Sequence, residues 1–288
     1  MSTEILPPDD NQPNSPHEGV MGFWDHVEEL RWVLIKSSVI FMIAFCLVLG
    51  FAVWFADVLQ WPLMRAFAMI GDPQRDILLR TDGPLNVFGF LLQLGFFGAI
   101  GVSLPFILYF IVSFISPGLT DQEKSVLRPV CLSILMLFLI GAFVAFFLLL
   151  PFYLFVSLKF EQMFNFASLW TPVKYYGLVV WTTLGLGVVF QSPLIIIILM
   201  YLDIVTAEQL RSGRRYAIVI ILVLSAFLTP GGDPITLSVT AIPLYALYEG
   251  ALIVGARVRA RKKEEFDFDN YDDGYDHDYH DDYPDDHD

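Results

Sequence analysis

The sequence has few cysteines and few charged residues. Its 288 residues include two cysteines, Cys46 and Cys131. Both lie inside apolar runs, so neither a disulfide framework nor a cysteine metal site is predicted. Only 17% of the residues are charged, whereas a soluble domain usually has about 25%. Hydrophobic residues make up 56% and the mean hydropathy is +0.59. These values indicate an integral membrane protein.

Signatures of the common enzyme classes are also missing. The sequence contains no H-E-x-x-H, no G-x-S-x-G and no P-loop pattern. Gly231-Gly232-Asp233 is similar to the G-x-G-D of intramembrane aspartyl proteases, but Pro230 stands where the first glycine should be. We therefore expect no catalytic site, no metal, no cofactor and no nucleic-acid partner. Any work must then draw on an ion gradient or a partner protein.

The acidic balance of the chain comes from its C-terminal tail. The formal net charge is -14, but residues 264–288 hold thirteen of the 31 acidic residues and no basic residue. This tail alternates Asp, Tyr and His and has no core to pack, which predicts disorder. The expected division is a disordered N-terminal tail at 1–21, a membrane domain at 22–258, and a disordered tail at 259–288 that is first basic and then acidic.

Six apolar segments predict an all-α membrane fold with six transmembrane helices, because a span needs roughly 20 apolar residues and lipid requires backbone groups to be satisfied within the segment. The segments are 33–56, 84–113, 127–157, 174–202, 215–229 and 235–256. Pro105, Pro193 and Pro243 lie inside these segments and predict kinked helices around a concave bundle. The fifth and sixth helices are expected to be short.

The positions of the basic residues predict the orientation. An even number of spans puts both termini on one side, and twelve of the 17 Lys and Arg residues fall there. The positive-inside rule therefore predicts that both termini are cytoplasmic. The external side then has long loops at 57–83 and 158–173 and a short turn at 230–234.

Two acidic positions border the cytoplasmic ends of the first three spans. Asp25 and Glu28 have the spacing of a helix N-cap and its partner, which leaves Glu29 as a separate carboxylate at the membrane surface. Glu123 falls in the first turn of the third span, where a carboxylate suits the helix dipole. Both could be ordinary interfacial charges. Alternatively, the pair could bind guanidinium groups, which carboxylates hold in a bidentate fork.

Polar residues also lie inside the fourth and sixth spans. Gln191, in the middle of the fourth, either takes part in an interhelical hydrogen bond or is a functional group. Glu249, near the cytoplasmic end of the sixth, is either functional, or it reaches the headgroups or pairs with Arg257. Further polar positions expected to contact the membrane interior or a partner are Thr236, Ser238 and Thr240.

Four motifs, in order and in register with the six spans, resemble those of the TatC family over about residues 22–258. They are His-x-x-Glu-Leu-Arg, Phe-x-x-Pro-x-Leu with a following Glu, Leu-Thr-Pro with a nearby Asp, and Pro-x-x-x-x-Tyr/Phe-Glu. The matching residues are His26, Glu29, Leu30 and Arg31, then Phe114, Pro117, Leu119 and Glu123, then Leu228, Thr229, Pro230 and Asp233, and finally Pro243, Tyr248 and Glu249. Pro62 in the first external loop also fits the family.

The resemblance implies a receptor in the bacterial inner membrane for the twin-arginine signal peptides of folded cargo. Glu29 and Glu123 would read the paired arginines, and the other residues of the first two motifs would complete the peptide site. Single-span TatA and TatB type subunits would dock along helices five and six, in a receptor complex with further copies of the chain, and transport would use the proton motive force. Gln191 departs from the family, which often has Glu there.

Two other functions stay open at this point. A proton-coupled transporter of a small solute would explain bent helices with polar residues in the membrane, but not paired carboxylates outside it. A non-catalytic assembly scaffold would need none of these residues for binding.

Overall fold

The computed structural model describes residues 23–71, 79–81, 83–115, 121–166, 170–229 and 231–275. Within these ranges, only the backbone is described for residues 23, 25, 112, 115, 121–131 and 262–275. The elements are α1 (Phe23–Gly50), α2 (Ala52–Leu59), α3 (Trp61–Ile70), α4 (Pro84–Ile115), α5 (Asp121–Phe143), the π-helix η2 (Val144–Leu149), α6 (Leu150–Met163), α7 (Pro172–Val189), α8 (Ser192–Tyr201), α9 (Ala207–Ser212), α10 (Arg214–Leu228) and α11 (Pro234–Tyr275).

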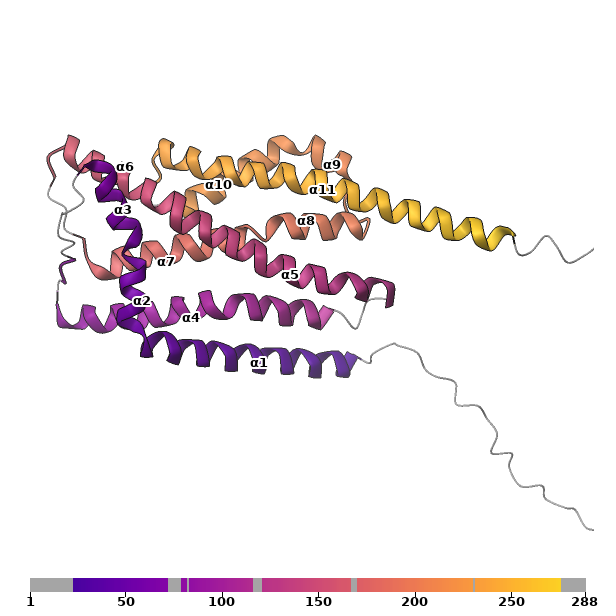
Figure 1. The fold of residues 1–288 in the computed structure, drawn as a ribbon, viewed down its shortest axis with the longest axis horizontal. Coiled ribbons are helices and arrows are strands. Elements are labelled where there is room, and N and C mark those ends of the chain that lie inside the picture. The colour runs from indigo at the N-terminus through magenta and orange to yellow at the C-terminus, as the bar shows by residue number, and fades with distance from the viewer. Residues whose placement is uncertain are drawn as a thin grey trace, which may run out of the picture.

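The long helices run side by side in one bundle (Figure 1). At one end, α2 and α3 lie across the bundle, and we call this the cap end. At the opposite end α1 begins and α11 leaves the bundle, and we call this the tail end. Helix α4 packs against α1 on one side and α7 on the other, while α11 packs against α8 and α10.

The all-helical membrane fold predicted from the sequence is confirmed. Among the described residues, five helical stretches are long and apolar enough to span a membrane: His26–Gly50, Pro84–Ile111, Leu132–Met163, Pro172–Tyr201 and Pro234–Arg261. The predicted fifth helix is α10, which has only 15 residues. At 1.5 Å per residue it is roughly 22 Å long, which is less than the hydrocarbon core of about 30 Å.

Helix α11 is longer than its apolar stretch suggested. It has 42 residues and continues to Tyr275, into the segment where a disordered tail was expected from residue 259. Arg, Ala, Lys and Glu fill residues 259–265, and all four are strong helix formers, so the helix can continue beyond the membrane. Its membrane-spanning stretch alone, Pro234–Arg261, has 28 residues, so the sixth helix is not short as expected. Residues 276–288, like 1–22, lie outside the described residues.

Proline affects the spans differently at different positions. Pro105 and Pro243 lie inside α4 and α11, which continue through them. Pro193 instead ends a regular helix: α7 stops at Val189, Gln191 forms a turn, and α8 begins at Ser192. Because proline has no N–H to donate, the backbone hydrogen-bond ladder is interrupted at this point of the fourth span.

The third span contains a π-helix that the sequence analysis missed. Buried residues recur every four positions at Gly141, Ala145, Leu149 and Tyr153. In an α-helix each such step turns the side chain by roughly 40° away from its starting direction. The wider helix of Val144–Leu149 compensates for this drift. It therefore keeps Tyr153, in the following helix, directed into the bundle.

Helices α5 and α7 cross closely at two glycines. A Cβ on Gly141 would lie 3.0 Å from the Cα of Gly187 and 2.7 Å from a ring carbon of Phe190. Small residues allow such a close approach between membrane helices, where van der Waals packing replaces the hydrophobic effect as the driving force.

The loop expected at 57–83 contains helical structure. Pro62 lies in the first turn of α3, where its missing N–H has no helical acceptor in any case. It is buried together with Leu63, Ala66 and Phe67. Through this face α3 packs against α6 and covers the cap end of the bundle. Pro62 thus has a structural position in a helix and not in an extended loop.

Candidate functional site

Glu29 carries an unsatisfied carboxylate oxygen at the tail end. Its side chain is half-buried on α1, and its Oε2 atom is buried with no hydrogen-bond partner in the part of the chain that the structure describes. An acceptor that has lost water without gaining a donor is costly, more so when it is charged. The neighbouring Glu28 and Arg31 are exposed.

A ring contact connects the start of α1 to the end of α4. The rings of His26 and Phe114 are stacked with their centroids 4.3 Å apart and an interplanar angle of 21°. This contact brings the first two sequence motifs together, because His26 belongs to the first motif and Phe114 to the second. Pro117 and Leu119 lie outside the described residues. Helix α5 begins at Asp121, so Glu123 belongs to its first turn, but the Glu123 side chain is also outside the described part.

Gln191 occupies the break between α7 and α8. It is 7% exposed, and its Nε2 donates a 3.0 Å hydrogen bond to the carbonyl of Ile134 on α5. This is the interhelical hydrogen bond that one of the two interpretations expected. Its Oε1 is buried without a hydrogen-bond partner among the described residues. The amide therefore joins two spans where the backbone ladder is interrupted, and it keeps one acceptor open.

Glu249 forms an ion pair with a residue of another helix. Its Oε2 lies 2.8 Å from Nη2 of Arg214, the first residue of α10, and its Oε1 accepts a 2.8 Å hydrogen bond from the Tyr245 hydroxyl. Of the alternatives considered for Glu249, the pairing with Arg257 is therefore replaced by a pairing with Arg214. Arg257 lies eight residues further on, about 12 Å along the helix. Arg214 is closer because the segment 202–213 folds the start of α10 back beside α11.

Asp233 caps the start of α11. Its Oδ1 accepts hydrogen bonds from the backbone N–H groups of Ile235 and Thr236 at 3.1 and 2.9 Å, and its Oδ2 accepts from the Thr236 hydroxyl. Partial burial raises the pKa of Asp233, but these hydrogen bonds outweigh that effect and the pKa is lowered overall. The carboxylate that the sequence singled out here thus serves the fold.

The three polar positions of α11 divide into two kinds. Thr236 and Thr240 are buried, and the Thr240 hydroxyl donates a 2.8 Å hydrogen bond to the Thr236 carbonyl. Because that hydrogen is used, the Tyr153 hydroxyl on α6 donates to Thr240 Oγ1. Ser238 is exposed and donates to the Pro234 carbonyl at 2.6 Å. Only Ser238 of the three is therefore on the outside of the bundle.

The sequence analysis missed Arg214 and Tyr153. Arg214 stands in a basic cluster with Arg211 and Arg215, which was read only as an orientation signal. Tyr153 follows Pro151 within an apolar run, and a tyrosine hydroxyl there needs a partner. That need was the available signal, but it does not identify which helix supplies the acceptor.

The comparisons with known proteins agree with this architecture. The family model of the Sec-independent protein translocase protein TatC matches residues 25–243. The chain is 31% identical over 249 residues to the Sec-independent protein translocase protein TatC of Aquifex aeolicus, an alignment that covers 85% of this chain and 98% of that protein. The chain belongs to the TatC family.

Another relative and a solved structure extend the match. The TatC protein of Deinococcus radiodurans is 29% identical over 266 residues, covering 91% of this chain and 97% of that one. A crystal structure described as the twin arginine translocase receptor TatC superimposes with a TM-score of 0.68 at 30% identity, covering 81% of this chain and 99% of the other.

Family membership establishes the broad function. The chain is an integral membrane subunit of a Sec-independent protein translocase, and it acts in a complex with other Tat subunits. TatC is not a family of known catalytic enzymes.

Proposed function

We propose that the tail end binds twin-arginine signal peptides through Glu29 and Glu123. The observation that carries this proposal is the buried Oε2 of Glu29, which has no hydrogen-bond partner among the described residues. An arginine of a bound peptide would supply the missing donor. A guanidinium has five N–H groups in a planar fork, and it remains charged at all relevant pH values.

The proposed site has a fixed base and a second carboxylate. The stacked rings of His26 and Phe114 hold the start of α1 against α4, so Glu29 need not be ordered when the peptide binds. Pre-ordered groups bind more tightly because less conformational entropy is lost. We propose Glu123, in the first turn of α5, as the acceptor for the second arginine, with Arg31, Pro117 and Leu119 at the edge of the peptide site.

We further propose a membrane orientation for the bundle and a surface on which partner subunits dock. In this account the tail end faces the cytoplasm of a bacterial inner membrane, as the distribution of basic residues predicts. TatA and TatB type subunits would pack along α10 and α11, and further copies of the chain would complete the receptor complex. The roughly 22 Å length of α10 supports such a site, because the bilayer must thin beside a short helix unless a partner covers it. Transport of folded cargo would then draw on the proton motive force.

Peptide binding to Glu→Gln variants tests the carboxylate site. We expect Glu29→Gln and Glu123→Gln, in the purified full chain in lipid nanodiscs, each to weaken binding of a labelled twin-arginine peptide by on the order of 2–5 kcal/mol, less if water enters the site. A twin-lysine peptide should bind weakly to every form, because lysine cannot make the bidentate contact.

Glu28→Gln is the matched control. Glu28 is exposed, and it is one residue away from Glu29 on the same helix, so the substitution removes the same charge at nearly the same place. We expect unchanged affinity. Equal losses in Glu28→Gln and Glu29→Gln would show that general charge attraction holds the peptide, and the proposed site would be rejected.

A further inference from the structure

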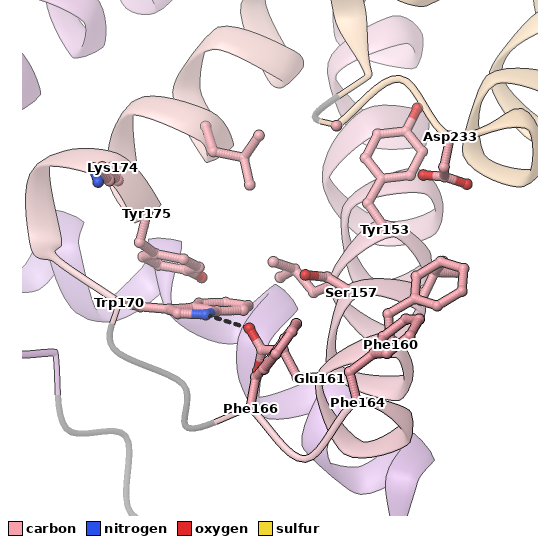
Figure 2. Close-up of a pocket in the computed structure, with 14 residues that line it drawn as sticks. Tyr153, Ser157, Phe160, Glu161, Phe164, Phe166, Trp170, Lys174, Tyr175 and Asp233 are labelled. Atoms are coloured by element: carbon pink, nitrogen blue, oxygen red, sulfur yellow. Dashed lines mark hydrogen bonds between the residues drawn. The ribbon is translucent and has the colours of Figure 1, made fainter.

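A cavity of about 500 Å³ opens near the cap end (Figure 2). The last turns of α6, the first turn of α7 and the turn before α11 form its walls. Its lining residues with charged side chains are Glu161, Lys174 and Asp233. The first two lie two residues inside the ends of their spans at Met163 and Pro172, and Asp233 directly precedes the span that starts at Pro234. The cavity is therefore level with the lipid headgroups.

The lining combines aromatic rings with two carboxylates. Figure 2 shows Trp170 and Tyr175 on one side and Tyr153 and Phe160 on the side of α6. The Trp170 and Tyr175 rings are stacked 6.3 Å apart, and the Trp170 indole N–H donates to Glu161 Oε1 at 2.9 Å. Ring faces and carboxylates both attract ammonium groups, and the attraction is stronger where water is excluded.

The cavity also has one cationic group at its wall. Lys174 forms no ion pair with any carboxylate in the described part of the chain. Its ammonium group is exposed at the first turn of α7, so it can meet an anionic group of an occupant. A ligand that suits the whole cavity has an ammonium group and, a few bonds away, a phosphate.

The mouth of the cavity is apolar and exposed. Phe160, Phe164 and Phe166 are 41%, 58% and 69% exposed, and all three line the opening. Exposed aromatic rings at this depth are typical of the membrane interface, where they contact both headgroups and acyl chains. A water-soluble ligand would gain nothing from this rim, whereas a lipid would cover it.

We propose that this cavity binds the headgroup of a zwitterionic phospholipid of the phosphatidylethanolamine type. The ammonium lies among Glu161, Trp170 and Tyr175, the phosphate contacts Lys174, and the acyl chains pass over the three phenylalanines. The bound lipid closes the gap between α6, α7 and the turn before α11. This assignment is independent of peptide binding at the tail end.

Lipid titration followed by native mass spectrometry tests the assignment. The full chain is delipidated in detergent and titrated with dioleoyl-phosphatidylethanolamine or with dioleoyl-phosphatidylglycerol, which has the phosphate but no ammonium. We expect phosphatidylethanolamine to bind about tenfold more tightly. Glu161→Gln should remove this preference while its amide oxygen still accepts the Trp170 hydrogen bond, and Lys174→Gln should weaken binding of both lipids.

Lys159→Gln is the matched control. Lys159 is exposed on the same helix as Glu161 but does not line the cavity, so its loss should leave both affinities unchanged. Equal binding of the two lipids by the parent chain would overturn the proposal. So would an unchanged preference in Glu161→Gln, or a co-purified peptide that occupies the cavity in place of lipid.

Discussion

The cap end and the tail end of the bundle differ in how their polar groups are satisfied. At the cap end, three polar side chains bond within the chain: the Tyr175 hydroxyl donates to the Leu59 carbonyl, Gln60 donates to the Tyr176 hydroxyl, and Asp233 caps α11. Gln93 Oε1, nine residues into α4 and beside Gly177, is buried without a partner among the described residues, but it belongs to a neutral amide. At the tail end, Glu29 keeps a buried oxygen without a partner among the described residues. Internal bonds stabilise the fold, whereas an open acceptor is available to a ligand.

The ion pairs at the tail end are exposed and therefore add little to the stability of the fold. Arg214 and Glu249 are 49% and 25% exposed in their side chains, and Arg259 and Asp203 are 37% and 55% exposed. Exposed pairs contribute about 0–1 kcal/mol. They orient the segment between α8 and α10 without adding much stability. The difference between the two ends can therefore be tested by measuring melting temperature and peptide affinity in variants of each end.

The largest loss of stability is expected for Asp233→Ala. The substitution removes the three hydrogen bonds that cap α11, and loss of a helix cap costs about 1–2 kcal/mol. Thermal unfolding of the purified protein measures the loss, and Asp233→Asn should retain part of the cap. A melting temperature that does not change in Asp233→Ala would mean that the cap is not needed for the fold.

A smaller loss is expected for Tyr175→Phe. The ring remains, but the buried Leu59 carbonyl loses its 2.8 Å donor, and the net contribution of such a hydrogen bond to stability is about 0.5–1.5 kcal/mol. Tyr216→Phe is the control, because Tyr216 is 62% exposed on α10. If both variants unfold at the parent temperature, the Tyr175 hydroxyl does not stabilise the cap end.

Gln191 gives a third, weaker test. Gln191→Leu removes the bond to the Ile134 carbonyl, and such interhelical bonds contribute about 0.6 kcal/mol on average. Gln191→Glu should be tolerated, because a carboxyl buried in the membrane stays protonated and can donate to the same carbonyl. Export of a folded twin-arginine reporter measures both. Full export with Leu, or loss of export with Glu alone, would contradict this role.

The smallest effect concerns pH. The folded-state pKa of Asp233 lies below its ordinary value of 3.8. Its contribution to stability is therefore fully present above pH 3.8 and is lost as the pH falls through the folded-state value. The difference in melting temperature between the parent and Asp233→Asn should thus shrink below about pH 4. A difference that stays constant down to pH 3 would show that the carboxylate charge is unimportant.

Features that depend on residues close together in the sequence could be predicted, whereas contacts between residues far apart in the sequence could not. Hydrophobic length predicted the spans, and local spacing placed Glu123 in the first turn of a helix. The partner of Glu249 could not be predicted, because Arg214 meets it only through the fold of 202–213. The helices α2 and α3 were not predicted, because the surface on which α3 packs belongs to α6, which lies far away in the sequence. Capping by Asp233 followed a local pattern that the analysis could have recognised.

The most direct test of the contrast measures stability and peptide affinity together on Glu29→Gln and Asp233→Ala. Each variant is unfolded by heat and is also titrated with a twin-arginine peptide at a temperature where both are folded. We predict that Glu29→Gln loses affinity and keeps its melting temperature, whereas Asp233→Ala loses melting temperature and keeps its affinity. If both variants lose both properties together, the two ends are not functionally separate and the account is contradicted.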